Sequence, residues 1–295
     1  MNLKKISALA AGVALTLGMA ASAQAVTLTA GNIKLTINNY DSGTTGYETA
    51  APFGFSTVCN TALTCDAAGT LPSVNGIGSE DSWGIFSIAN ITRISDNSII
   101  WSAGAGEYLT GIFGGLADTK VEVLKVGSTA DHTFTYAEGG WLKLFKNTAD
   151  YNANVGPFGR IGVDGFDSIS NTGGTLMLDA VFGAGVLFGD TTHTYASDFA
   201  NAGISGHGQG YLDVVGGEWG GVNGVLNSNS LTDPNGGKHD LFLDTTYHAT
   251  PEANALGWAV VSASQVDGRA LPEPGSIALF GLGLAGLAAL RRRKA

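Results

Sequence analysis

The sequence predicts an all-β protein with an antiparallel β-sandwich or jelly-roll-like body, and three observations support this fold class. Short runs rich in β-branched and aromatic residues alternate with clusters of Gly, Asn, Asp and Ser, which is typical of many short strands joined by turns. Glycine is frequent, at 44 of 295 residues, without the Gly-X-Y period of collagen. The body has no amphipathic helix of ten or more residues, so it lacks the crossovers that a parallel sheet needs.

Individual strands can be located from their alternation. Ile33, Leu35 and Ile37 face one way and the polar residues between them face the other, as in a half-buried strand. The run SWGIFSIANITRI predicts a longer apolar strand. Further candidates are IIWSA, EYLTGIFGGL, KVEVLKV, HTFTYAE, GWLKLFKN, GTLMLDAVFG, GYLDVVGG, HDLFLDTTYH and GWAVVSASQV. The Gly-rich stretch from Tyr195 to Gly210 is either a long loop or a boundary between subdomains, so the body is either one domain or two.

The first 25 residues have the order of a secretory signal peptide. Lys4 and Lys5 precede an apolar stretch, and Ala23 and Ala25 form an Ala-x-Ala site. We expect cleavage after Ala25; the alternative is an uncleaved N-terminal anchor, for which the apolar stretch is short. The expected organisation is therefore a signal peptide at 1–25 and a β-rich extracytoplasmic domain at 26–270, followed by a separate C-terminal segment at 271–295.

Charge and cysteine usage are consistent with export. The chain has 25 acidic and 15 basic residues, for a net charge of −10, and shows no basic face for binding nucleic acid. Such a surface suits contact with polysaccharide or divalent cations. Cys59 and Cys65 are a close pair, which in an exported protein predicts a local disulfide. The alternative, a redox or metal pair, lacks both the C-x-x-C spacing and a nearby His.

The C-terminal segment has three parts in a fixed order. A Pro-Glu-Pro bracket precedes the apolar run Gly275–Leu290, which as a helix spans about 24 Å, short of the roughly 30 Å bilayer core. The basic cluster after it can snorkel and remain cytoplasmic, giving a transient stop in the inner membrane or, alternatively, a permanent anchor. The bracket is Pro272, Glu273 and Pro274, and the basic retention cluster is Arg291, Arg292, Arg293 and Lys294.

This arrangement resembles the PEP-CTERM sorting signal of Gram-negative bacteria. The resemblance implies recognition by an exosortase, a membrane-embedded cysteine transpeptidase, and a final place at the cell surface or in the extracellular matrix. It also implies an association with exopolysaccharide, biofilm or floc formation. The stretch Leu271–Gly275 also resembles the sortase motif LPxTG, but Pro274 replaces the Thr that carries the scissile carbonyl, so we favour the exosortase.

Patterns that suggest catalysis or cofactors are weak. GLGLAG at 281–286 lies in the apolar run, without the βαβ context of a nucleotide site. GISGHG, with Ser205 and His207, lacks the second Gly of a nucleophile elbow. Oxygen-rich turns could bind calcium, although they do not fit an EF-hand. Their residues are Asp164, Asp167, Asp233, Asn235 and Asp240. We expect no cofactor, no catalytic residue and no metal site, and surface or turn positions for the five histidines.

The leading functional hypothesis is a non-enzymatic surface or matrix protein whose partners are the exosortase and extracellular polysaccharide. The alternative is a carbohydrate-binding, lectin-like module in which exposed tryptophans stack on sugars, although most of them are expected in the core. These are Trp83, Trp101, Trp141, Trp219 and Trp258. A secreted glycoside hydrolase with paired carboxylates is the third candidate.

Overall fold

The computed structural model describes residue 28 and residues 30–43, 82–104, 106–126, 129–161, 163–169, 173–200, 205–221 and 224–271. Its longer strands are β1 (Gly31–Gly43), β2 (Ser82–Arg93), β4 (Tyr108–Val126), β5 (Thr129–Asn147), β8 (Thr175–Gly183), β9 (Tyr195–Ala200), β10 (Ser205–Gly216), β13 (Leu241–His248) and β14 (Val260–Ala270). The short elements are β3 (Ile99–Ser102), β6 (Arg160–Ile161), β7 (Gly165–Phe166), β11 (Leu231–Thr232), β12 (Lys238–His239), the 3-10 turns Ala153–Val155 and Pro157–Gly159, and helix α3 (Pro251–Leu256).

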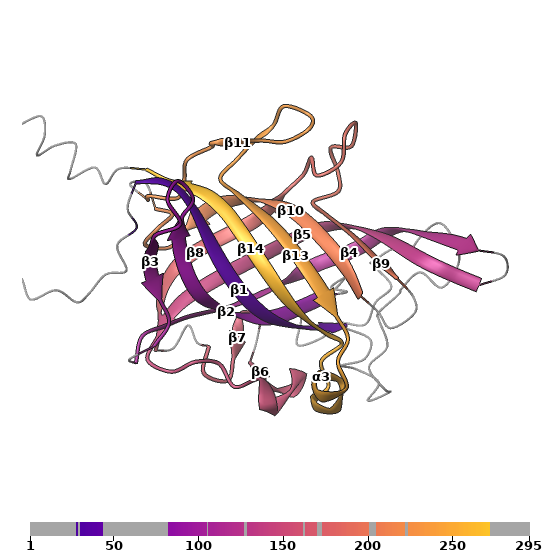
Figure 1. Cartoon of the computed structure of the whole chain (residues 1–295), viewed down its shortest axis with the longest axis horizontal. Helices are drawn as coiled ribbons and strands as arrows, with labels where there is room; N and C mark the ends of the chain where they lie inside the picture. Colours follow the sequence, from indigo (N-terminus) through magenta and orange to yellow (C-terminus); the bar gives the residue numbers. More distant parts are fainter. Residues whose placement is uncertain are drawn as a thin grey trace, which may run out of the picture.

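The longer strands form one closed antiparallel barrel (Figure 1), whereas β6 with β7 and β11 with β12 form two separate two-stranded sheets. Each long strand pairs with its neighbours around the barrel, and β1 pairs with β14 from Gly31↔Ala270 to Asp41↔Val260, which closes the sheet. The prediction of an all-β antiparallel fold is confirmed, but a sandwich or jelly roll is not. Those folds need strands that change between two sheets, whereas here the sheet curls until its first and last strands meet and no main edge is left.

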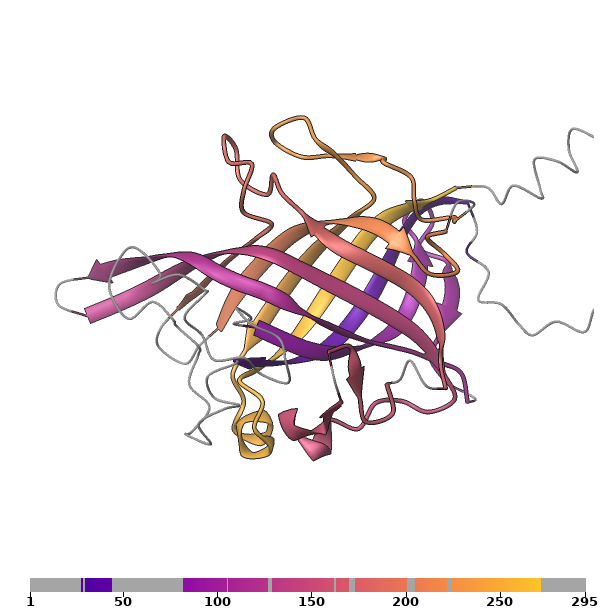
Figure 2. The same ribbon diagram turned by 180° about the vertical axis from the view of Figure 1, so that it is seen from behind.

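One of the eight positions around the barrel is shared by two strands. β8 and β9 both lie between β5 and β10, with β8 covering one half of their length and β9 the other. The intervening residues 184–194 leave the wall and return, next to the loop that carries β11 and β12 (Figure 2). The stretch from Tyr195 to Gly210, expected to be a long loop or a boundary, therefore contributes β9 and the first half of β10 to the wall.

The inward side chains differ between the two ends of the barrel. The end where β1 begins and β14 finishes is filled by apolar residues such as Ile33, Leu35 and Val266, each at most 2% exposed. Ile33, Leu35 and Ile37 all point inward, which confirms the predicted face of this strand. Towards the other end the inward positions become polar, and the interior is hollow. We call these the packed end and the cavity end.

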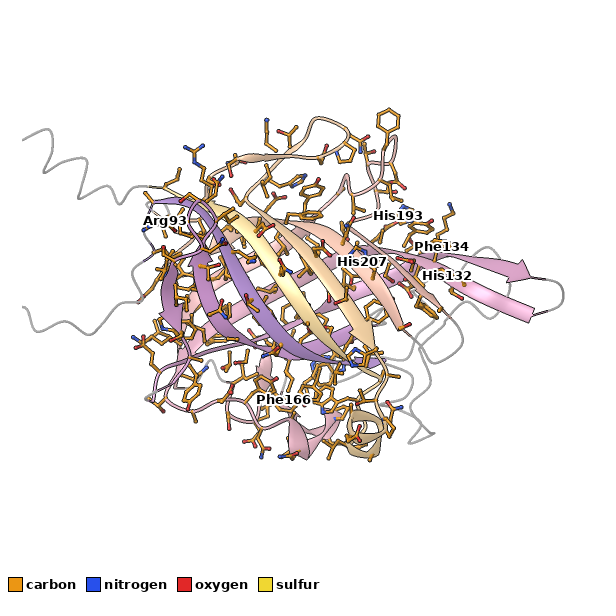
Figure 3. The ribbon with its side chains drawn as sticks, in the orientation of Figure 1. Arg93, His132, Phe134, Phe166, His193 and His207 are labelled. Carbon is orange, nitrogen blue, oxygen red and sulfur yellow. The ribbon has the colours of Figure 1, made fainter. Side chains whose placement is uncertain are left out.

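A second apolar cluster lies on the outside of the wall near the cavity end. Trp83 of β2 and Trp258 after α3 are fully buried there, together with Phe166 of β7, which Figure 3 places beside α3. The long connection between β5 and β8 covers this part of the wall together with α3. The run from Ser82 is therefore apolar on both faces, because β2 is buried from inside and outside alike.

Several sequence predictions concern residues outside the described ranges. They are the signal peptide with Ala23 and Ala25, the Cys59–Cys65 disulfide, the Pro-Glu-Pro bracket, the apolar run and the basic cluster. Within the described ranges, no helix has the length and apolar character needed to cross a bilayer.

Candidate ligand cavity inside the barrel

The cavity has a volume of about 140 Å³ and is lined by inward-facing side chains from every long strand of the wall except β10. It reaches the end of the barrel, since its lining includes Asp41 near the end of β1, Ser82 at the start of β2 and Ala259 just before β14. The cavity therefore extends to the cavity end of the barrel, whereas apolar side chains fill the packed end.

The floor of the cavity is aromatic and aliphatic. Phe86, Phe113 and Phe182 come from β2, β4 and β8, and Leu142 from β5 lies among them. The ring of Phe182 meets Tyr195 edge to face, with centroids 5.9 Å apart. This part of the lining can bury an apolar group.

β10 contributes no side chain to the lining of the cavity because glycines occupy its inward positions there. Gly206 and Gly208 point inward at successive positions. A Cβ on Gly206 would lie 2.6 Å from the ring of Tyr247, and one on Gly208 would collide with the hydroxyl of Tyr195. The two tyrosine rings thus lie directly against the backbone of β10, which only glycine permits here.

Hydroxyl groups of the upper wall are hydrogen-bonded to one another. Ser264 Oγ donates to Thr245 Oγ1 at 2.6 Å, and Ser262 and Ser264 both contact Asn39 Oδ1. Thr135 Oγ1 and Ser197 Oγ are 2.7 Å apart across β5 and β9. These pairs satisfy the polar groups of strands that are far apart in the chain, so they fix the spacing of the wall at the cavity end.

The charge that faces the cavity is negative. Asp41 and Asp118 line it, and none of its described lining residues is Lys, Arg or His. Burial raises the pKa of Tyr195 and of Tyr247, and both aspartates raise the pKa of each phenol further. Both tyrosines are therefore neutral hydrogen-bonding groups at neutral pH, in a field set by two carboxylates.

The Asp-rich turns considered for calcium form hydrogen bonds and an ion pair within the protein. Asp233 accepts hydrogen bonds from the amides of Asn235 and Gly237, and Asp240 accepts from three amides. Asp164 pairs with Lys143 at 2.7 Å. Within the described part of the chain, no group of three or more His, Cys, Asp or Glu side chains is arranged to hold a metal ion.

Four of the five histidines pair with aspartates. His132 and His207 pair across the outer wall with Asp198 and Asp244, at 2.8 and 2.6 Å. Figure 3 shows both on the half of the molecule away from Arg93, which marks the packed end. Ser205 and His207 lie on β10, not on the strand–turn–helix of a nucleophile elbow, and His207 is turned towards Asp244. The remaining pairs are His193 with Asp190 and His239 with both Asp213 and Asp233.

The tryptophans do not form a sugar-stacking platform. Trp83, Trp219 and Trp258 are buried, and Trp101 and Trp141 are half-buried against the apolar clusters. None of the five lines the cavity.

Sequence reasoning did not identify the cavity residues. A weak signal was present in SAS at 262–264 and YAS at 195–197, where hydroxyl residues recur at every second position and so share a face. Nothing in those segments indicates that the shared face encloses a space with Asn39, whose hydrogen bond to Ser264 joins residues 225 apart.

Comparison with known proteins identifies only the end of the chain. Residues 270–294 match the family described as the PEP-CTERM protein-sorting motif. The match begins at Ala270, the last residue of β14. No curated protein and no solved structure matches the chain significantly.

Proposed function

From the PEP-CTERM protein-sorting motif that the chain carries at residues 270–294, we propose that it is a non-enzymatic protein of the cell surface or extracellular matrix. The motif implies an exported protein that an exosortase sorts to the cell envelope. In the proposal, Met1–Ala25 directs export, Gly275–Leu290 pauses in the inner membrane, and the barrel is delivered to the exopolysaccharide of a biofilm or floc.

The proposal is supported by the position at which the C-terminal sorting segment leaves the barrel. The matched segment begins at Ala270, the last residue of β14, and Ala270 pairs with Gly31, so both ends of the barrel chain leave from the packed end. The cavity lies towards the other end of β14, where Ser264, Ser262 and Val260 line it, and Val260 is about 33 Å along the strand from Ala270. A barrel attached through its C-terminus would hold its cavity end away from the attachment.

The lectin-like alternative loses its main sequence support, since the tryptophans pack into the molecule. Contact with polysaccharide in our proposal would use the acidic outer surface and its hydroxyl groups. The glycoside hydrolase depends on a carboxylate pair, for which Asp41 and Asp118 are the candidates in the cavity. We favour binding over hydrolysis because the space there accommodates about one ring, not the two sugars that flank a scissile bond.

The sorting part of the proposal can be tested by replacing Pro272, Glu273 and Pro274 with Ala in the native cell. We expect the variant to keep its C-terminus, to accumulate in the inner membrane and to be lost from the surface, as measured by intact mass and surface labelling. Glu252→Ala, on the exposed side of α3, is the control and should be trimmed and displayed normally.

Normal trimming and display of the triple variant would contradict exosortase sorting. The matrix role is tested separately, by deleting the protein and measuring aggregation of cells and retention of exopolysaccharide; unchanged values would refute it. The non-enzymatic assignment would be refuted if the purified protein released reducing sugar from a polysaccharide and Asp41→Asn abolished this release.

A further inference from the structure

We propose that the cavity inside the barrel is a binding site for a small neutral apolar molecule, which rests on the floor formed by Phe86, Phe113 and Phe182. The site needs no charged group of the lining, because Asp41 and Asp118 already interact with other groups of the protein. It is separate from any polysaccharide contact on the outer surface, so the inference does not rest on the proposed matrix role.

The interior is hollow because its aromatic rings lie along the wall instead of reaching across it. Phe86 covers Gly111 on the neighbouring strand β4, where an added Cβ would collide with the ring. In the same way Phe113 covers Gly84 of β2, where an added Cβ would lie 2.6 Å from the ring. Each ring occupies the space of a side chain that its partner strand lacks, so the centre of the barrel stays open there.

The same arrangement recurs on β8. Phe182 lies between Gly140 of β5 and Gly210 of β10, where an added Cβ would come within 2.7 and 2.9 Å of its ring. Together with the two tyrosine rings that lie against β10, these contacts make the hollow a property of the fold itself. A ligand therefore enters a preformed site and does not have to open one.

Apolar side chains that face inward and remain accessible mark the place of the ligand. Phe113 and Leu243 line the cavity and are only half-buried, unlike the inward residues of the packed end. Phe86 and Phe182, beside them in the lining, are at most 6% exposed. A group that covers Phe113 and Leu243 removes apolar surface from water, and the free energy gained is roughly proportional to that area.

The size of the space defines the size of the ligand. Its volume of about 140 Å³ is close to that of an apolar protein cavity of about 150 Å³ that accepts benzene. The site therefore accepts a molecule with one six-membered ring or a short branched chain.

The polar part of the lining disfavours sugars and anions. Ser264 with Thr245, and Thr135 with Ser197, already form short hydrogen bonds within the wall. A sugar would have to break such bonds in order to use these groups. A carboxylate or phosphate would be buried without a cationic partner, since none of the described lining residues is Lys, Arg or His. A neutral apolar molecule makes neither demand.

The test uses the purified mature chain and three probes: toluene, benzoate and glucose. Calorimetric titration should show toluene binding at least about tenfold more tightly than benzoate or glucose, because toluene leaves water without losing a polar partner. Leu243→Trp places a larger side chain in the cavity and should weaken toluene binding at least about tenfold. The matched control is Thr246→Trp, on the same strand but exposed on the outer face, which should bind toluene as the wild-type chain does.

Nuclear Overhauser contacts from the toluene ring to Phe113 and Leu243 in the wild-type chain provide a second measurement, which decides the question even where Leu243→Trp does not fold. The absence of these contacts, no binding of toluene, or binding of benzoate or glucose as tightly as toluene would each overturn the proposal. So would equal toluene binding by the two tryptophan variants, which would indicate adsorption to the outer surface.

Discussion

At the scale of residues, two buried side chains, His239 and Asp240, have hydrogen-bond partners at each of their ring nitrogens or carboxylate oxygens. The imidazole of His239 lies between two carboxylates, with Nδ1 2.8 Å from Asp213 and Nε2 3.1 Å from Asp233, and its ring stacks on Tyr211. Asp240 is 3% exposed and accepts from the amides of Val214, Ser228 and Asn229. Polar groups are stable in such places only when each has a partner, so these residues anchor the loop that precedes β13.

Asp240 provides the sharpest test at this scale. Asp240→Ala leaves one buried and two part-buried amides without their acceptor, and hydrogen bonds to a charged group contribute about 1.5–3 kcal/mol each. We expect the free energy of unfolding to fall by about 3 kcal/mol or more in urea denaturation. Asp240→Asn keeps one acceptor oxygen and should lose less.

Asp244→Asn serves as the comparison for this prediction, because its side chain is 45% exposed and its partner, His207, is on the surface. We expect a change within about 0.5 kcal/mol for it. Similar losses for the alanine variant of Asp240 and for the control would contradict the anchoring role of Asp240.

At the scale of elements, a cover of irregular chain completes the core on the outside of the barrel. Helix α3 is limited to six residues by Thr250, which accepts from the amide of Ala253, and by Gly257, which ends the helix with a φ of 101°. This sharp end places Trp258 against Trp83 and Phe166, with ring centroids 5.7 and 5.8 Å away. Trp258 also donates from Nε1 to the carbonyl of Ala153, which fastens the connection between β5 and β8.

Removal of this ring should release the cover. For Trp258→Ala we expect the free energy of unfolding to fall by about 3–5 kcal/mol, because the side chain is fully buried, and faster proteolysis within residues 148–174. Phe158→Ala, in the same connection but 63% exposed, is the matched control and should change stability by less than about 1 kcal/mol. Unchanged proteolysis in the tryptophan variant would show that the cover is held by other contacts.

At the scale of the whole molecule, closure of the barrel depends on its first and last strands. β1 pairs with both β2 and β14, which closes the ring of strands, whereas β4 pairs with β2 from Thr110 to Leu116 and continues to Val126 paired with β5. Closure pairs strand edges through which sheets otherwise aggregate, which is useful in an exported protein. The amide of Leu271 donates the last backbone hydrogen bond of the described chain, to the carbonyl of Val225. We therefore expect the melting temperature to depend little on the residues after Leu271.

Truncation tests this independence. A mature chain ending at Leu271 should melt within about 2 °C of the full mature chain, because all pairings of β14 are kept. A chain ending at Ala259 loses β14, leaves unpaired edges on β1 and β13, and should aggregate or fail to melt cooperatively. A large drop in melting temperature for the first truncation would show that the sorting segment contributes to the fold.

Much of the candidate site could not be predicted from the chain because it is assembled from distant strands. The inward face of β1 was predictable, since Ile33, Leu35 and Ile37 follow a period of two. Asn39 and Asp41 are the next residues on the same face, and both border the cavity. This could not be predicted, because the cavity depends on the residues that β9, β13 and β14 place opposite them.

By itself, the sequence determined the features that depend on local order. Strand alternation predicts antiparallel β structure, and the Pro-Glu-Pro bracket, apolar run and basic cluster form a sorting signal, because each is a pattern of neighbouring residues. Only the tertiary structure decided between a sandwich and a barrel, and only it brought phenylalanines and hydroxyl residues from different strands to one cavity. The physical reason is that alternation fixes which side of a strand is buried, whereas curvature and the pairing of the first strand with the last decide what that side encloses.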